Sequence, residues 1–158
     1  MNHSVRTGVS FGLTSGVITT LGLIVGLAAS TSSRLVIIGG ILTIAIADAF
    51  SDALGIHVSE ESENRHSEKQ IWQSTLATFA TKFAIALSFA APVLLLGLRE
   101  AVAVSVGWGF LLTGEFSYYL SRLERKNACR VVCEHLIITA VVVITTYLAG
   151  NLISAAFS

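Results

Sequence analysis

Two long stretches without a charged side chain constrain the fold more than any other feature of this sequence. Residues 7–33 lie between Arg6 and Arg34, and residues 136–158 close the chain. About 20 apolar helical residues cross the hydrocarbon core of a bilayer, and both stretches exceed that length. Charged residues make up only 13% of the chain, roughly half the share of a soluble domain. We therefore expect an integral membrane protein with the lipid bilayer as its surroundings.

The charge balance and the motif content exclude several other classes. Ten Lys and Arg balance ten Asp and Glu, so no basic excess is available for phosphate groups and we expect no nucleic-acid partner. Two cysteines are too few for a secreted disulfide framework. Cys129 and Cys133 are four positions apart, which fits either a soft-metal pair or two bystander thiols. No nucleophile–base arrangement or phosphate loop is present, so we expect neither an enzyme nor a permanently bound cofactor.

The apolar runs are continuous rather than alternating, which favours helices over barrel strands. We expect an all-α, polytopic protein whose residues 1–158 form one transmembrane domain. Pro92 should bend the third span. The first run is longer than a signal-peptide core, so we expect it to be retained. The predicted spans are 8–29, 35–57, 72–98, 101–121 and 133–155, with a polar inner loop at 59–70.

The placement of Lys and Arg predicts the orientation of these five spans. Basic residues should be enriched on the cytoplasmic side, which favours an inner N-terminus and an outer C-terminus. The connection between the third and fourth spans, at Arg99 and Glu100, is very short. The alternative to five spans is therefore that the third and fourth form a single span. A prokaryotic plasma membrane is the expected location. The inner side would hold Arg6, Arg65, Lys69, Arg122, Arg125, Lys126 and Arg130, and the outer side Arg34 and Arg99.

Three carboxylates lie inside the predicted spans, where a charged group costs at least about 2.5–3.5 kcal/mol. At a rise of about 1.5 Å per residue, Asp48 lies about 3 Å, Asp52 about 9 Å and Glu115 about 6 Å beyond the middle of their spans. Both spans run from outside to inside, so the three acids fall in the same half of the bilayer. Asp48 and Asp52 also share one helix face.

Two interpretations of these acids are open. A cluster of carboxylates with hydroxyl neighbours is the hard-oxygen environment that divalent cations prefer, and buried carboxylates also carry protons. The predicted metal ligands are Asp48, Asp52, Glu115, Ser15, Ser51 and Thr19. The alternative is that the acids are protonated or paired with Lys82, which lies within the third span near its inner end. Three acids outnumber this one lysine, which favours a cation or proton site.

The first span places its glycines, together with Ser15 and Thr19, on one helical face. Small faces let helices approach closely. We expect this face to form a homodimer seam or the wall of a conduit, and ordinary packing within one chain is the alternative. The glycines are Gly8, Gly12, Gly16, Gly22 and Gly26.

The loop at 59–70 is rich in acidic residues that would lie at the inner mouth of such a conduit. These side chains could attract or bind cations there, and the alternative is a solvated helical extension whose charges pair with one another. The possible inner-mouth ligands are Glu60, Glu61, Glu63, His66 and Glu68.

Five segments resemble the vacuolar iron transporter family. They are FGLTSGVITTLGLIVGLAAS at 11–30, ADAFSDALGIHVSEESE at 47–63, AAPVLLLG at 90–97, FLLTGEFSYYLSR at 110–122 and EHLIITAVVVITTYLAGNLI at 134–153. Each motif alone is weak, but their order and spacing together are more specific. The resemblance implies a five-helix dimer that exports a divalent metal from the cytosol in exchange for protons.

The resemblance also implies where this chain departs from the family. Ser15 stands where the family has an aspartate, Asp52 where it has a methionine, and Asp48 where a small residue is usual. The family glutamate of the second span maps near Ile44, and the large cytoplasmic metal-binding helices are absent between the second and third spans. Carboxylate oxygen favours harder ions than methionine sulfur does, so Fe²⁺, Mn²⁺, Mg²⁺ and a proton-only role are all open.

We therefore expect a proton-coupled divalent metal cation transporter, with Fe²⁺ or Mn²⁺ as its substrate and protons as counter-ions. The first alternative is a non-transporting assembly or regulatory protein of the same fold, in which the acids pair with Lys82. The second is a proton-coupled transporter of an organic solute, which the low aromatic content of 8% does not favour.

Overall fold

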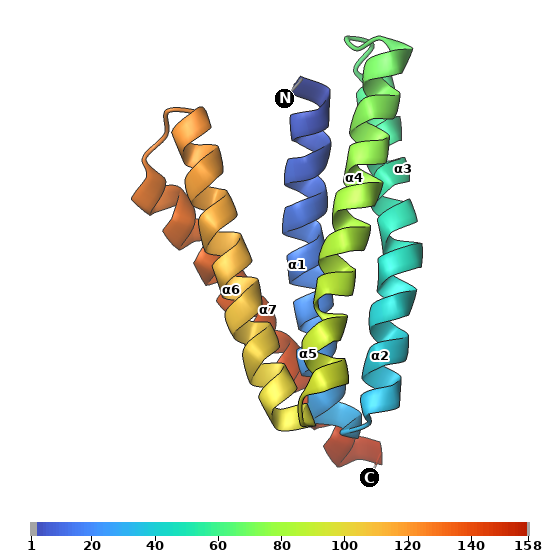
Figure 1. The fold of residues 1–158 in the computed structure, drawn as a ribbon, viewed down its shortest axis with the longest axis vertical. Helices are drawn as coiled ribbons and strands as arrows, with labels where there is room; N and C mark the ends of the chain where they lie inside the picture. Colours follow the sequence, from blue (N-terminus) through green and yellow to red (C-terminus); the bar gives the residue numbers. More distant parts are fainter. Residues whose placement is uncertain (1–2, 158) are drawn as a thin grey trace.

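The computed structural model describes residues 3–157, which form helices joined by short turns. The helices are α1 (His3–Thr31), α2 (Arg34–Thr43), the π-helical η1 (Ile44–Asp48), α3 (Ala49–Ser62), α4 (Glu68–Ser88), α5 (Ala90–Leu95), α6 (Leu98–Leu123) and α7 (Ala128–Phe157). Because α2, η1 and α3 are continuous and one residue separates α4 from α5, the chain forms five long helical segments (Figure 1). The all-α expectation is confirmed for the described residues.

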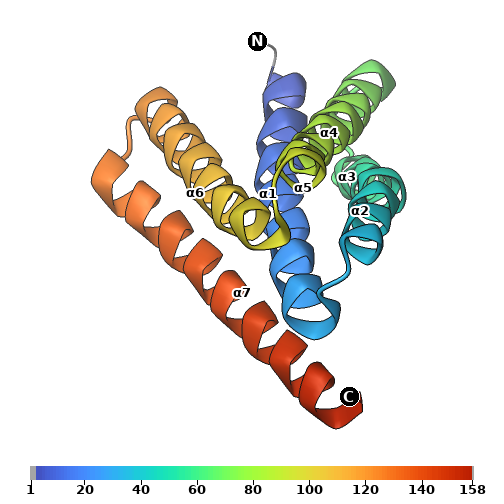
Figure 2. The same ribbon diagram turned by 60° about the horizontal axis from the view of Figure 1, so that its bottom comes forward.

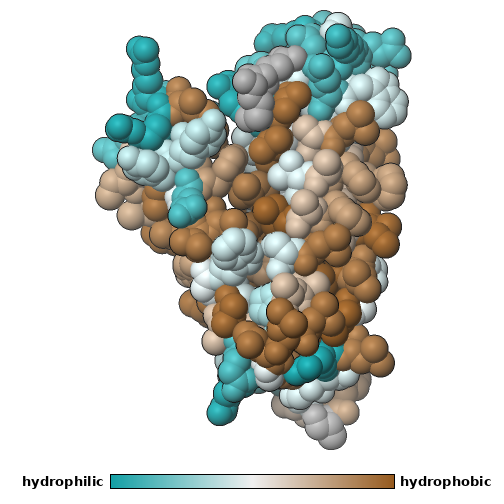
Figure 3. All heavy atoms as spheres, in the orientation of Figure 1, coloured by the Kyte–Doolittle hydropathy of each residue, from teal (hydrophilic) through white to brown (hydrophobic). Residues whose placement is uncertain are grey.

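Four of the five segments are long and apolar enough to cross a membrane: His3–Thr31, Arg34–Ser62, Glu68–Leu95 and Ala128–Phe157. The fifth, α6, has the length of a span but is more polar, because it includes Arg99, Glu100, Glu115 and Arg122. Figure 3 shows an apolar middle with hydrophilic surface at both ends of the molecule. The multi-pass architecture thus holds, while five spans and their orientation stay predictions.

Helix α1 lies at the centre of the bundle. It packs most extensively against α4 and α7, and also against α2 and α6 (Figures 1 and 2). The buried apolar core follows its second half, where Val17, Leu21 and Ile24 meet Ile37 of α2 and Phe89. Burial of these side chains holds the neighbouring helices around the C-terminal half of α1. Toward the N-terminus, α6 and α7 diverge from α1 (Figure 1).

The glycines of α1 are used for packing within the chain. A Cβ on Gly12 would lie 2.6 Å from the Thr78 carbonyl oxygen of α4, and a Cβ on Gly8 would come still closer to the Ser74 carbonyl oxygen. Gly22 and Gly26 instead face Thr146 of α7. The predicted single glycine face is therefore divided between two helices. The homodimer stays a prediction, but α4 and α7 already occupy the seam proposed for it.

Local sequence signals explain where the helices end. Pro92 cannot donate to the carbonyl of Ser88 and its ring clashes there, so α4 ends at Ser88 and α5 begins two residues later. Ser67 and Gln70 form a capping box at the start of α4. The predicted loop at 59–70 is shorter than expected, because α3 continues to Ser62 and α4 begins at Glu68. Residues 59–62 thus belong to α3, as the alternative of a helical extension expected.

Candidate functional site

Lys82 is the centre of the most concentrated group of charges within the bundle. Its side chain is completely buried, and its Nζ lies 2.6 Å from Asp48 Oδ2 and 2.5 Å from Asp52 Oδ2. Nζ also donates a hydrogen bond of 2.9 Å to Ser15 Oγ. Three oxygens from α1, η1 and α3 thus converge on one ammonium group of α4. We call Lys82, Asp48, Asp52 and Ser15 the ionic cluster.

Close contact between α1 and α4 brings Lys82 to this position. A Cβ on Gly12 would lie 3.2 Å from the Lys82 backbone nitrogen, and a Cβ on Gly16 would lie 3.4 Å from Lys82 Cα. Without side chains at these two positions, α4 approaches α1 closely enough for Nζ to reach Ser15. The glycine pattern of the first helix therefore builds the site, in addition to holding the bundle together.

A π-helical turn positions the first of the two aspartates. The five residues of η1 end at Asp48, directly before α3. Such turns are rare and occur frequently at functional sites. Asp52 follows four residues later in regular α-helix, and both carboxylates reach the same ammonium group. Nothing in the local sequence explains why the π-helical turn forms here.

The ionic cluster carries an excess of negative charge when all its groups are ionised, since two carboxylates face one ammonium. Asp48 Oδ2 is buried, and its 2.6 Å ion pair with Lys82 Nζ is the contact that compensates its charge. The side chains of Asp48 and Asp52 are 31% and 19% exposed on the isolated chain, whereas Lys82 is 0% exposed. The ammonium group thus contacts the two carboxylates on the side that faces the bundle interior. The opposite side of each carboxylate is partly exposed.

The expected convergence of three acids is not found within one chain. Glu115 is exposed on α6, which packs against α1, α5 and α7 and makes no extensive contact with η1 or α3. Ser51 is also exposed, and the Thr19 hydroxyl donates to the Ser15 carbonyl. Across residues 3–157, no group of three or more His, Cys, Asp and Glu side chains is arranged to hold a metal ion. The pairing of Asp48 and Asp52 with Lys82, weighed as the alternative, is the arrangement observed.

Only one of the predicted inner-mouth ligands points into the bundle. Glu60 is buried and accepts a hydrogen bond of 2.6 Å from Ser74 Oγ. His66 is half-buried and its ring stacks on that of His3, with 6.4 Å between centroids. The remaining three acids of the set, Glu61, Glu63 and Glu68, are exposed. Cys129 and Cys133, near the same end of the molecule, are free and exposed.

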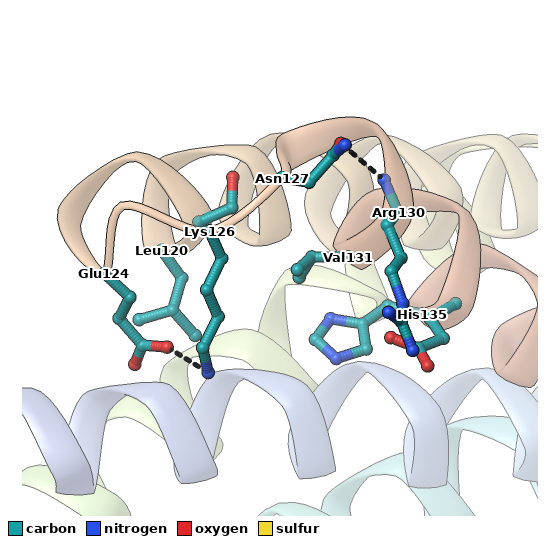
Figure 4. A pocket seen from close by; sticks show the side chains of 9 residues that line it. Leu120, Glu124, Lys126, Asn127, Arg130, Val131 and His135 are labelled. Atoms are coloured by element: carbon teal, nitrogen blue, oxygen red, sulfur yellow. Dashed lines mark hydrogen bonds and ion pairs between the residues drawn. The ribbon is translucent and has the colours of Figure 1, made fainter.

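A polar cavity of about 540 Å³ lies beside the α6–α7 turn (Figure 4). Lys126 forms an ion pair of 2.6 Å with Glu124 there. The hydrogen bond from Lys126 is the main cause that lowers the pKa of Glu124, and the positive charges of Lys126 and Arg6 lower it further. His135 lines the same cavity and its Nδ1 lies 2.7 Å from Ser117 Oγ. Charged side chains of both signs line this cavity, and no member of the ionic cluster does.

Sequence patterns identified most of the ionic cluster but not its geometry. Asp48, Asp52 and Ser15 were predicted as ligands, and Lys82 only as an alternative partner. The burial of Glu60 was missed, although its position eight residues after Asp52 places both on one helix face. This spacing in the sequence could have indicated that Glu60 faces the bundle interior.

A bundle of long apolar helices with a cluster of charged side chains at mid-length defines a class, the multi-pass α-helical membrane proteins with an intramembrane polar site. Ionisable residues at such depth mark ion or proton pathways. Within this class, the model of the VIT family matches residues 5–71, and this match supports the predicted family. The match includes Ser15, Asp48 and Asp52 and ends before Lys82. The chain matches no curated protein and no solved structure.

Proposed function

We propose that this protein is a divalent metal cation transporter that uses the ionic cluster as its intramembrane ion site. The observation that carries the proposal is the convergence of Asp48, Asp52 and Ser15 oxygens on one point, two of them carboxylates, in the segment that matches the VIT family. Oxygen ligands from several helices are what a hard divalent cation requires when it leaves water. The net negative charge of the cluster, two carboxylates against one ammonium, attracts a further cation.

The finer features of the proposal follow from the sequence. Fe²⁺ or Mn²⁺ would leave the cytosol in exchange for protons, which the same carboxylates would carry on the return step. The five helical segments would all span the membrane of a prokaryotic cell, with the N-terminus inside and the C-terminus outside. A homodimer would cover the outward sides of Asp48 and Asp52, because a carboxylate facing lipid is costly.

The proposal is tested by metal flux into liposomes that contain the purified full chain. We expect uptake of at least one ion among Fe²⁺, Mn²⁺, Co²⁺, Zn²⁺ and Mg²⁺, with a rate that differs between two pH values. The change Asp52→Asn should reduce this flux to the level of empty liposomes, because it removes one of the two charged ligands while leaving Asp48 to pair with Lys82.

Glu115→Gln is the matched control, since it also neutralises an acid within a long helical segment but lies outside the ionic cluster. We expect it to retain flux. Undiminished flux in Asp52→Asn would remove the ionic cluster from the transport path. Loss of flux in Glu115→Gln alone would instead place the path along α6.

The ion pairs of Lys82 also favour a second candidate function, a non-transporting membrane protein of the same fold. In that case the ionic cluster would hold α1, α3 and α4 together. Metal-dependent thermal stabilisation separates the two, because a ligand that binds only the folded protein must stabilise it. Stabilisation by Mn²⁺ that disappears in Asp48→Asn and Asp52→Asn would favour transport, and no stabilisation by any of the five metals would favour the structural role.

A further inference from the structure

The side chain of Lys82 occupies the place that a bound cation would take in the ionic cluster. An ammonium group has three N–H donors, and Nζ has three oxygens at 2.5–2.9 Å, from Asp52, Asp48 and Ser15. These oxygens come from three different helical elements. The lysine therefore places a single positive charge among the kind of oxygen ligands that a metal ion prefers.

An arriving ion would reach the two carboxylates from their exposed sides and would compete with the buried ammonium for the same oxygens. Lys82 is fully buried and comes from within the bundle, whereas the side chains of Asp48 and Asp52 are partly exposed. The α4 backbone is held against α1 at Gly12 and Gly16, so a change at this point involves the flexible lysine side chain rather than the helix.

We propose that Lys82 is a tethered counter-cation that competes with the transported ion for Asp48 and Asp52 and so keeps ion binding weak enough for release. The inference rests on the proposed function and adds to it the residue that sets affinity. An ion path requires a site that attracts the ion but does not retain it. Two carboxylates without a competing charge would hold a divalent cation too tightly, and the ammonium supplies the opposing charge inside the site.

The test compares Mn²⁺ binding to the full-length wild type, Lys82→Met and Lys82→Arg in detergent by titration calorimetry. Removing a positive charge in contact with both ligands should tighten Mn²⁺ binding by about tenfold or more. Lys82→Arg keeps the charge and should bind Mn²⁺ as weakly as the wild type. In liposomes, Lys82→Met should transport more slowly than the wild type because release becomes limiting.

A second neutral variant keeps the test informative if Lys82→Met does not fold. Lys82→Gln retains a donor for the carboxylates and should show the same tighter Mn²⁺ binding. Failure of both neutral variants to fold, even with Mn²⁺ present, would overturn the proposal, since the lysine would then be a structural requirement. Equal Mn²⁺ affinity in Lys82→Met and Lys82→Arg would overturn it as well.

The outcomes separate this inference from the transport function. Normal wild-type flux with unchanged Mn²⁺ affinity in Lys82→Met would overturn only the role of Lys82. Absence of wild-type flux for all five metals, together with tighter Mn²⁺ binding in Lys82→Met, would overturn transport and support competition at the ionic cluster. Lys69→Met, which removes an exposed lysine, should change neither measurement.

Discussion

Each charge of the ionic cluster requires the others to stay inside the bundle. An unpaired ammonium in a dry interior is strongly unfavourable, and Lys82 is completely buried. The two carboxylates compensate its charge, and Ser15 supplies a neutral acceptor at 2.9 Å. Ser15 thus holds the ammonium toward α1 without adding charge, which explains how a serine is accommodated where the resemblance to the family leads one to expect an acid.

At the level of single residues, Ser15→Ala should destabilise the protein modestly. Lys82 would lose one acceptor while keeping both ion pairs, and a typical intramolecular hydrogen bond contributes about 0.5–1.5 kcal/mol, or somewhat more with a charged donor. Thermal unfolding of the purified protein in detergent measures the effect. Ser51→Ala, on the exposed side of α3, is the control. Equal stability of the two variants would show that the contact between Ser15 and Lys82 does not contribute.

At the scale of the helices, α1 is the element on which the fold depends. Its first glycines face α4 and its later glycines face α7, while Val17, Leu21 and Ile24 fill the core. Because close helix approach in a membrane relies on small residues, this single helix sets the distances to both neighbours. The ionic cluster depends on the distance between α1 and α4.

The change Gly12→Ala should therefore destabilise the protein and disturb the ionic cluster. The added Cβ would lie 2.6 Å from a backbone oxygen of α4 that cannot rotate away, and overpacking of this kind costs about 1–3 kcal/mol. Gly39→Ala is the control, because a Cβ there meets nothing within 4 Å and alanine is the better helix former. Thermal unfolding of both variants in detergent provides the comparison, and a Gly12→Ala protein as stable as Gly39→Ala would contradict the packing argument.

At the scale of the whole molecule, the positions of the turns define the two ends of the bundle. The N-terminus, the α3–α4 turn and the α6–α7 turn lie at one end, and the C-terminus lies at the other (Figure 1). Most of the basic residues outside the helix centres belong to the first end, as the orientation with an inner N-terminus requires. The polarity of α6 makes this segment the decisive one for the number of spans.

Cysteine labelling distinguishes five spans from four. In a protein with Cys129→Ser and Cys133→Ser, single cysteines at Ser32, Asn64 and Arg125 would be probed with a membrane-impermeant maleimide. All three positions are exposed. If α6 spans, positions 64 and 125 should react from the cytoplasmic side and position 32 from the outside. Reaction of position 125 from the same side as position 32 would show that α6 does not cross.

The sequence by itself determined the helical segments and identified the charged residues that are costly inside a membrane. Uninterrupted apolar runs leave the chain no alternative to helices in lipid, so their positions along the chain follow from composition. Pro92 marked the break between α4 and α5 for a local reason, the loss of a donor and a steric clash. Asp48, Asp52 and Lys82 stood out because charge inside an apolar run is costly wherever the helix lies.

Only the tertiary structure decided which of these charges meet. Helix periodicity gives the face of one helix and says nothing about which neighbour that face contacts. Equal depth therefore grouped Glu115 with the aspartates, while packing placed α6 on the other side of α1 and turned Glu115 outward. The same applies to the glycines of α1, whose one predicted face serves two partner helices, and to Lys82, which reaches two acids and a serine because α4 lies in direct contact with α1.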